Sequence, residues 1–231
     1  MLHLILNLIN KLKMKKIFLP LAVIAAVTFS SCGGNEKTDE ANDVAVENAE
    51  PTCFYVYNDE SSAVVKWTAF KTSAKVGVSG QFDEVSVTAG DKSTKITDVL
   101  KTIKFSIKTA STNTTNEGRD KKIVDAFFGT MITTDLIMGQ IKSAEGDNEK
   151  GSCIALITLN DVESEVNLNY VLTDNVVTLT GEMDINNWNG QAALTALNEV
   201  CSEKHKGEDG ESVTWPTVEL NIEATLNKKC H

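Results

Sequence analysis

The sequence predicts an all-β domain, an antiparallel barrel or sandwich of eight or nine strands with two short helices. Three observations support this prediction. Apolar and polar residues alternate along most of the chain beyond residue 54, which is typical of strands with one buried and one solvated face. The body is rich in Thr, Val and Ser, which favour strands, and the whole chain has only 3 Pro. No repeat with a period of roughly 20–50 residues and no βαβ rhythm is visible.

The alternation locates the strands in chain order. In segment 103–108, for example, Ile103, Phe105 and Ile107 share one face. The segments expected to form strands are 54–57, 63–71, 75–88, 103–108, 131–143, 152–160, 166–173, 177–185 and 218–226.

Segment 75–88 contains a slip in the alternation. Its apolar residues are even-numbered up to Phe82 and odd-numbered from Val85 onward. A slip of one residue indicates a bulge or bend, a feature that curls a sheet towards closure.

Two segments, 119–128 and 191–203, interrupt the alternation and are expected to form short helices. Asn189 is available as a cap near the start of the second helix. Three residues of that helix share one face at spacings of three and four: Leu194, Leu197 and Cys201.

Residues 1–31 are expected to form a secretory signal peptide. An apolar run at 17–29, too short to span a membrane, follows two lysines and precedes two serines and Cys32. The small-small-Cys ending resembles a bacterial lipobox, which implies cleavage before Cys32 and acylation of its thiol. An uncleaved anchor helix is the alternative, and either Met1 or Met14 is the start. We therefore expect an outer-membrane lipoprotein of a bacterial envelope, facing the periplasm or the cell surface and held by its acyl anchor.

Segment 32–52 is acidic, contains Gly and Asn, and has no aromatic residue, which predicts a flexible tether before a folded domain at 53–231. Its acidity also resembles the surface-export signal of some Gram-negative lipoproteins, with a plain solubilising spacer as the alternative.

The mature chain is strongly acidic. The full chain has a formal charge of −10, and the 200 residues from Cys32 onward carry 18 basic and 32 acidic groups. This balance excludes a nucleic-acid-binding protein and electrostatic docking on an anionic membrane.

Four cysteines remain beyond Cys32, an even number that favours disulfides in an oxidising compartment, with three possible pairings. The favoured pairing joins Cys53 to Cys230 at the two ends of the folded region, which leaves Cys153 with Cys201. Metal binding is the rival, because Cys201 and His205 are four residues apart. There is no CxxC, however, and no metal site is predicted.

The sequence contains none of the common catalytic motifs, so we expect a protein that is not an enzyme. Asp120 and Asp125 near Arg119 could form an acid pair, but a solvated salt bridge is the favoured interpretation. The large aromatic residues either fill the core of a barrel or line a cavity for an apolar ligand, and composition does not separate the two. These residues are Trp67, Phe82, Phe105, Phe127, Phe128, Trp188 and Trp215.

Four stretches together resemble the YceI-like family of secreted, lipocalin-like barrels. They are 64–87 with its W-x-A-x-K and V-x-G-x-F spacings, 103–131 with an Arg-Asp pair and a paired Phe, 159–172, and 215–226. The resemblance covers nearly all of 54–227. The matching residues are Trp67, Ala69, Val78, Gly80, Phe82, Arg119, Asp120, Phe127 and Phe128.

The resemblance implies an extended eight-stranded antiparallel barrel with two short helices and a long apolar tunnel. The tunnel would bind an apolar lipid, either an isoprenoid quinone or another polyisoprenoid, and no other cofactor is expected. The expected tunnel-lining residues are Trp67, Ala69, Val78, Phe82, Phe105, Ile107, Phe127, Phe128, Leu168, Tyr170, Leu179, Met183 and Trp188. Lys71 stands where many members have a His, and the insertion that carries Cys201 and residues 207–216 is a candidate lid.

The alternative function is an envelope-stress or scaffolding lipoprotein with a filled core and a protein partner. A homodimer is compatible with either function.

Overall fold

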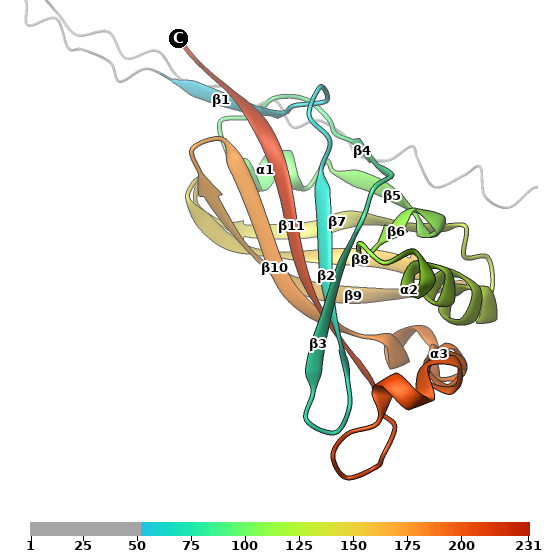
Figure 1. Ribbon diagram of the computed structural model, residues 1–231. Coiled ribbons are helices and arrows are strands. Elements are labelled where there is room, and N and C mark those ends of the chain that lie inside the picture. The colour runs from blue at the N-terminus through green and yellow to red at the C-terminus, as the bar shows by residue number, and fades with distance from the viewer. Residues whose placement is uncertain (1–51) are drawn as a thin grey trace, which may run out of the picture. The chain divides into compact units, whose positions relative to one another are not determined.

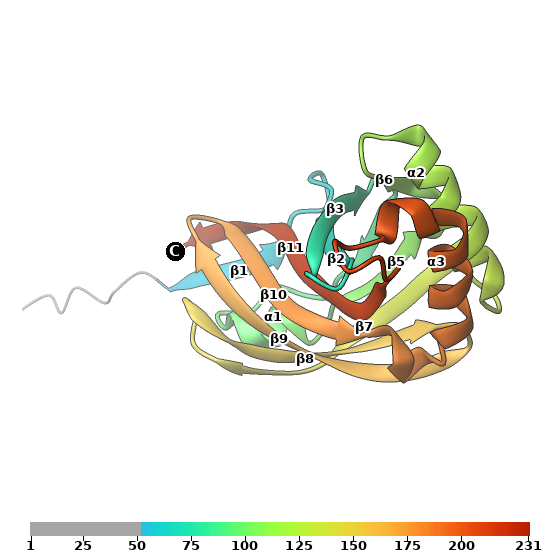
Figure 2. The same cartoon turned by 60° about the horizontal axis from the view of Figure 1, so that its bottom comes forward.

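The computed structural model describes residues 52–231; Cys32, the predicted signal peptide and nearly all of the predicted tether lie outside them. The described chain forms one long antiparallel sheet that curls around a core, with its helices at the two ends (Figures 1 and 2). The strands are β1 Cys53–Tyr57, β2 Val64–Lys71, β3 Val76–Phe82, β4 Val85–Thr88, β5 Lys104–Lys108, β6 Thr112–Asn113, β7 Leu136–Gly146, β8 Lys150–Leu159, β9 Val162–Thr173, β10 Val176–Asp184 and β11 Thr214–Cys230. The helices and helical turns are α1 Ile96–Leu100, η1 Thr109–Ser111, α2 Glu117–Lys122, η2 Ile123–Phe127, η3 Phe128–Thr130, η4 Ile185–Trp188 and α3 Gln191–His205.

The sheet closes on itself at a bend between β3 and β4. The hydrogen-bonded order runs β4-β5-β7-β8-β9-β10-β11-β2-β3-β6, and β3 continues into β4 through Asp83 and Glu84. Backbone bonds from Asp83 N to Ser111 O (3.1 Å) and from Lys108 N to Glu84 O (3.0 Å) tie this bend to the neighbouring chain. With β3 and β4 counted as one bent strand, the circuit has eight strands. The structure therefore confirms the predicted barrel, and the bend lies where the alternation slips.

The first and last strands are paired outside this circuit. β1 pairs with the end of β11, with Cys53 opposite Cys230, and these two residues form the favoured disulfide. The expected Cys153–Cys201 pair is wrong, since both residues are free and buried. Cys153 faces the core from β8, whereas Cys201 lies on α3.

The helices differ from the prediction in detail. The segment expected at 119–128 begins as α2 and continues through the π-type turn η2 into η3. Helix α1 was not predicted, because five residues are too few to show a helical period. Asn189 does not cap α3: it has a left-handed φ of 54° at the end of η4, and Gly190 occupies the cap position. β7 starts at Leu136 and not at residue 131, since the chain before it forms a turn.

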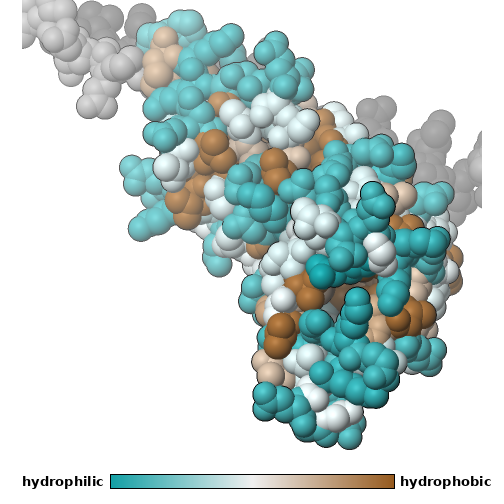
Figure 3. Space-filling view, in the orientation of Figure 1, coloured by the Kyte–Doolittle hydropathy of each residue, from teal (hydrophilic) through white to brown (hydrophobic). Residues whose placement is uncertain are grey.

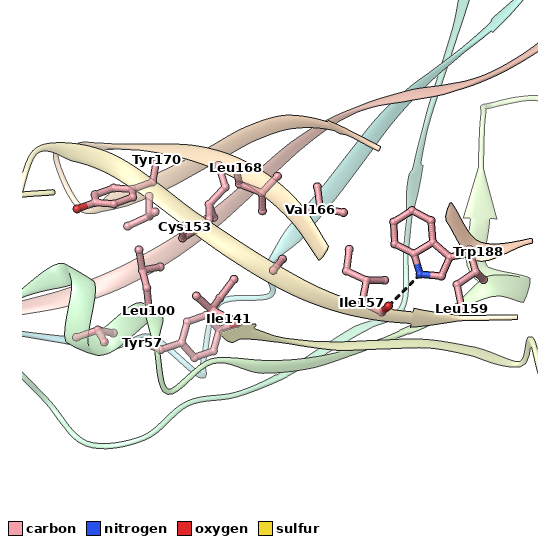
Figure 4. Close-up of a cluster of buried hydrophobic side chains, with 14 of the residues drawn as sticks. Tyr57, Leu100, Ile141, Cys153, Ile157, Leu159, Val166, Leu168, Tyr170 and Trp188 are labelled. Atoms are coloured by element: carbon pink, nitrogen blue, oxygen red, sulfur yellow. Dashed lines mark hydrogen bonds between the residues drawn. The ribbon is translucent and has the colours of Figure 1, made fainter. Parts of the chain in front are cut away.

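The half of the barrel interior next to α1 and β1 is filled. Tyr170 is fully buried there, and its hydroxyl donates to Asp147 O at 2.7 Å. Cys153, Leu168 and Leu100 pack around it (Figure 4). Burial raises the pKa of the Cys153 thiol to about 11. The filled half leaves the end near α2 and α3 as the place for a cavity.

The thiol state is the first testable outcome. A chain starting at residue 33, unfolded in denaturant without reductant, should show two reactive thiols, because Cys53 and Cys230 are bonded and Cys153 and Cys201 are not. In the native protein at pH 8, Cys153 should react at least about a hundredfold more slowly than in the unfolded chain, because its thiol is buried and scarcely ionised. Thiol titration checks both values. No reactive thiol after unfolding would show that Cys153 and Cys201 are paired after all.

Candidate binding cavity

The barrel encloses an apolar cavity of about 150 Å³ at the α2–α3 end. Its walls come from β2, β3, β5, β7, β8, β10 and β11, and η2, η3 and α3 close its side. Apart from the thioether of Met183, the only wall residues outside the hydrocarbon and aromatic classes are Thr112 and Thr214. Such a chamber excludes charge and suits a hydrocarbon ligand.

Eight of the thirteen residues predicted to line a tunnel line this cavity: Trp67, Ala69, Phe82, Phe105, Ile107, Phe127, Phe128 and Met183.

The other five do not line it. Val78 lies at the mouth described below. Leu168, Tyr170 and Leu179 face inward but belong to the packed core. Trp188 is fully buried, and its indole N–H donates to Ile157 O at 2.9 Å (Figure 4). Alternation predicts on which side of a sheet a residue lies, but not its depth along the barrel axis.

Several lining residues on β11 were not predicted as such. In the register, Leu220 lies opposite Trp67, and Val218 lies opposite Ala69. Their alternation was visible in the sequence, so the missing information was that β11 pairs with β2. The other lining residues of β11 and α3 outside the predicted set are Thr214, Trp215, Ile222, Leu194 and Leu197.

A row of aromatic rings follows one wall. Trp67 and Phe82 have ring centroids 6.5 Å apart, and Phe82 and Phe128 are 6.4 Å apart. Phe128 meets Phe127 edge-on at 5.1 Å. Gly80 gives the Trp67 indole its place, because a Cβ there would lie 2.4 Å from Trp67 Cζ2. The Trp67 indole nitrogen is buried and has no hydrogen-bond partner within residues 52–231.

A mouth of about 240 Å³ adjoins the cavity and shares Trp67, Ala69, Ile123, Leu197 and Thr214 with it. The mouth lies between the end of β2, α2 and α3, with Figure 3 showing apolar surface recessed among polar side chains in the lower part of the barrel. Its polar lining includes Lys71, Arg119, Lys122, Lys204 and His205.

Two of these lysines hold α3 beside the mouth. Lys71 Nζ donates to Lys204 O at 3.0 Å, and Lys122 Nζ donates to Val200 O at 2.8 Å. His205 Nδ1 forms a hydrogen bond with Thr214 Oγ1 at 2.8 Å. The part of the candidate lid that carries Cys201 is α3, which lies beside the mouth, and residues 206–213 lead from α3 into β11.

A larger hollow of about 780 Å³ lies on the outer face between the β2–β3 hairpin and β11. Polar side chains line most of it, including Lys66, Gln81 and Glu219, and it is an open groove. The smaller cavity is the better candidate site because its lining is almost entirely apolar.

Within residues 52–231, no cluster of three or more His, Cys, Asp or Glu could hold a metal ion. The described part of the chain has no helix with the length and apolar composition that crossing a membrane requires.

The chain is similar to a known family and to several solved structures. The family model described as YceI-like domain matches residues 55–226. A structure described as a polyisoprenoid binding domain from Saccharophagus degradans, implicated in plant cell wall breakdown, is 14% identical with a TM-score of 0.54, covering 78% of this chain and 100% of that one. Burkholderia cenocepacia BcnA is 11% identical with a TM-score of 0.50, covering 71% and 96%. These identities support the fold alone. No curated protein matches the chain.

The Trp67–Gly80 contact gives a stability test. Gly80→Ala should lower the free energy of unfolding by about 1–3 kcal/mol, because the new Cβ would lie 2.4 Å from the indole and force it to move. Urea denaturation measures the change.

Gly118→Ala is the matched control. A Cβ at this exposed position of α2 meets nothing closer than 3.5 Å, so stability should be unchanged or slightly higher. Equal effects of the two substitutions would contradict the described packing of Trp67.

Proposed function

The chain belongs to the YceI-like domain family, and from that premise we propose that its barrel binds the apolar tail of a polyisoprenoid-type lipid. The observation that supports this best is the apolar lining of the cavity, together with the mouth that adjoins it. The described polyisoprenoid binding domain from Saccharophagus degradans has the same fold, which adds support.

The physical basis of the affinity is burial of hydrocarbon. Each buried methylene contributes about 0.8 kcal/mol, from which the costs of association and ordering are subtracted. Each isoprene unit that the cavity buries therefore adds affinity without a polar contact. The hydroxyls of Thr112 and Thr214 are the only ones on the cavity wall, so we propose a binding role without chemistry on the ligand.

We also propose that the barrel is tethered to a membrane in the bacterial envelope through an acylated Cys32. The support is the sequence alone: the lipobox-like ending and the acidic segment after it. Twenty residues separate Cys32 from Cys53, which allows a reach of at most roughly 70 Å. This length suits a barrel that takes up and releases lipid at a membrane surface.

Titration with a long-chain isoprenoid quinone should quench the tryptophan emission of the chain from residue 33 onward. Trp67 and Trp215 line the cavity, whereas Trp188 lies in the packed core. Most of the quench should therefore persist in Trp188→Phe and be lost in a Trp67→Phe, Trp215→Phe double variant. Absence of any saturable quench in the parent chain would contradict lipid binding.

Ala69→Phe should weaken quinone binding at least about tenfold, because the added ring occupies the cavity that Ala69 lines. Ala74→Phe, on the exposed turn between β2 and β3, should leave the affinity unchanged. Fluorescence titration of the two variants compares them directly. Equal affinities would show that the quinone binds elsewhere, as expected of a barrel that acts through its outer surface and a protein partner.

A further inference from the structure

The mouth of the cavity is basic, although the chain as a whole is acidic. Four cationic side chains line it, and no Asp or Glu does. They come from β2, α2 and α3: Lys71, Arg119, Lys122 and Lys204. In a mature chain with 18 basic and 32 acidic groups, this local excess of positive charge needs a separate explanation.

Arg119 is the single arginine of the sequence and lies on α2 at this mouth. Its guanidinium takes part in none of the ion pairs formed within residues 52–231. By contrast, Lys121, which lies two residues further along the same helix, forms an ion pair with Asp125 at 2.6 Å. A guanidinium presents donors in a fork that fits both oxygens of a carboxylate or phosphate.

Two of the acids close in sequence to these cations have other partners. Asp120 Oδ1 accepts hydrogen bonds from the backbone N–H of Thr114 at 2.8 Å and from its hydroxyl. Glu203 pairs with Lys206 at 2.7 Å. Within residues 52–231, none of the four cationic groups of the mouth forms an ion pair with a carboxylate.

Lys71 and Lys122, which hold α3, each have N–H groups left to donate to a ligand. Lys71 and Lys122 each donate one hydrogen bond to an α3 carbonyl, and an ammonium has three N–H groups. Burial lowers the pKa of His205, and the positive charges of Lys71 and Lys122 lower it further. The buried Trp67 N–H, which has no partner within residues 52–231, belongs to a residue that cavity and mouth share.

We propose that this mouth binds an anionic headgroup, a carboxylate or a phosphate, of the amphiphile whose tail occupies the apolar cavity. The inference rests on the proposed function, since it places head and tail of one ligand in two adjoining compartments. An anion at the mouth would accept hydrogen bonds from Arg119 and Lys204 and lie in the field of Lys71 and Lys122. A neutral quinone head would leave these charges uncompensated.

The test compares ligands with the same tail and different heads. Farnesyl phosphate is paired with farnesol, and palmitate with hexadecanol, by isothermal titration of the chain from residue 33 onward. We expect at least one anionic probe to bind at least about tenfold tighter than its neutral partner, with an advantage that shrinks at higher salt. The anion with the larger advantage identifies the head as phosphate or carboxylate.

Arg119→Gln should reduce the advantage of the anionic probe about threefold to tenfold and leave the neutral probe unchanged. Lys121→Gln is the control, because it removes an equal charge from the same helix outside the mouth. Equal effects of the two substitutions would show a diffuse charge effect and overturn the assignment to Arg119.

The remaining outcomes separate the two proposals. Equal binding of anionic and neutral probes overturns the headgroup site and leaves the lipid-binding function standing. Binding of neither overturns both. Displacement of farnesyl phosphate by an equal concentration of inorganic phosphate would show that the mouth recognises a free anion and would overturn the claim that head and tail belong to one ligand.

Discussion

The bend between β3 and β4 is the constraint on which the rest of the structure depends. At Asp83 and Glu84 one strand leaves its partner β2 and joins β5, and this transfer converts an open sheet into a closed barrel. Closure gives every strand an inward face, so alternation along the sequence becomes a continuous apolar interior. Without closure, the hydrocarbon faces of β2 and β5 would not surround a common cavity, and Trp67 and Phe105 would lie on separate surfaces.

The barrel interior is packed at one end and hollow at the other. Near α1 and β1 the side chains pack solidly around Tyr170, and the Cys53–Cys230 disulfide joins the first and last strands of the chain. Near α2 and α3 the same kind of side chain leaves a cavity of about 150 Å³. An empty cavity of this size costs roughly 3–4 kcal/mol of stability. The packed half offsets this cost, and a bound hydrocarbon tail would recover part of it.

The sequence predicted the class of fold and nearly all of its strands, because a period of two is a local signal. The slip between Phe82 and Val85 even located the closing bend. The position of a residue along the barrel axis was not predictable. Leu168 and Phe105 show the same alternation, but only Phe105 lines the cavity. The basic mouth was also missed, because Lys71, Arg119 and Lys204 meet only when β2, α2 and α3 come together. The free state of Cys153 and Cys201 depends on the same long-range arrangement.

The most direct test of the central claim is native mass spectrometry of the mature protein purified from its own envelope, followed by organic extraction and identification of the bound molecule. The account predicts one isoprenoid-type lipid per chain, lost when the protein is unfolded. A chain that is recovered empty and stays empty after incubation with long-chain isoprenoids would contradict it. The function would then have to reside on the outer surface of the barrel.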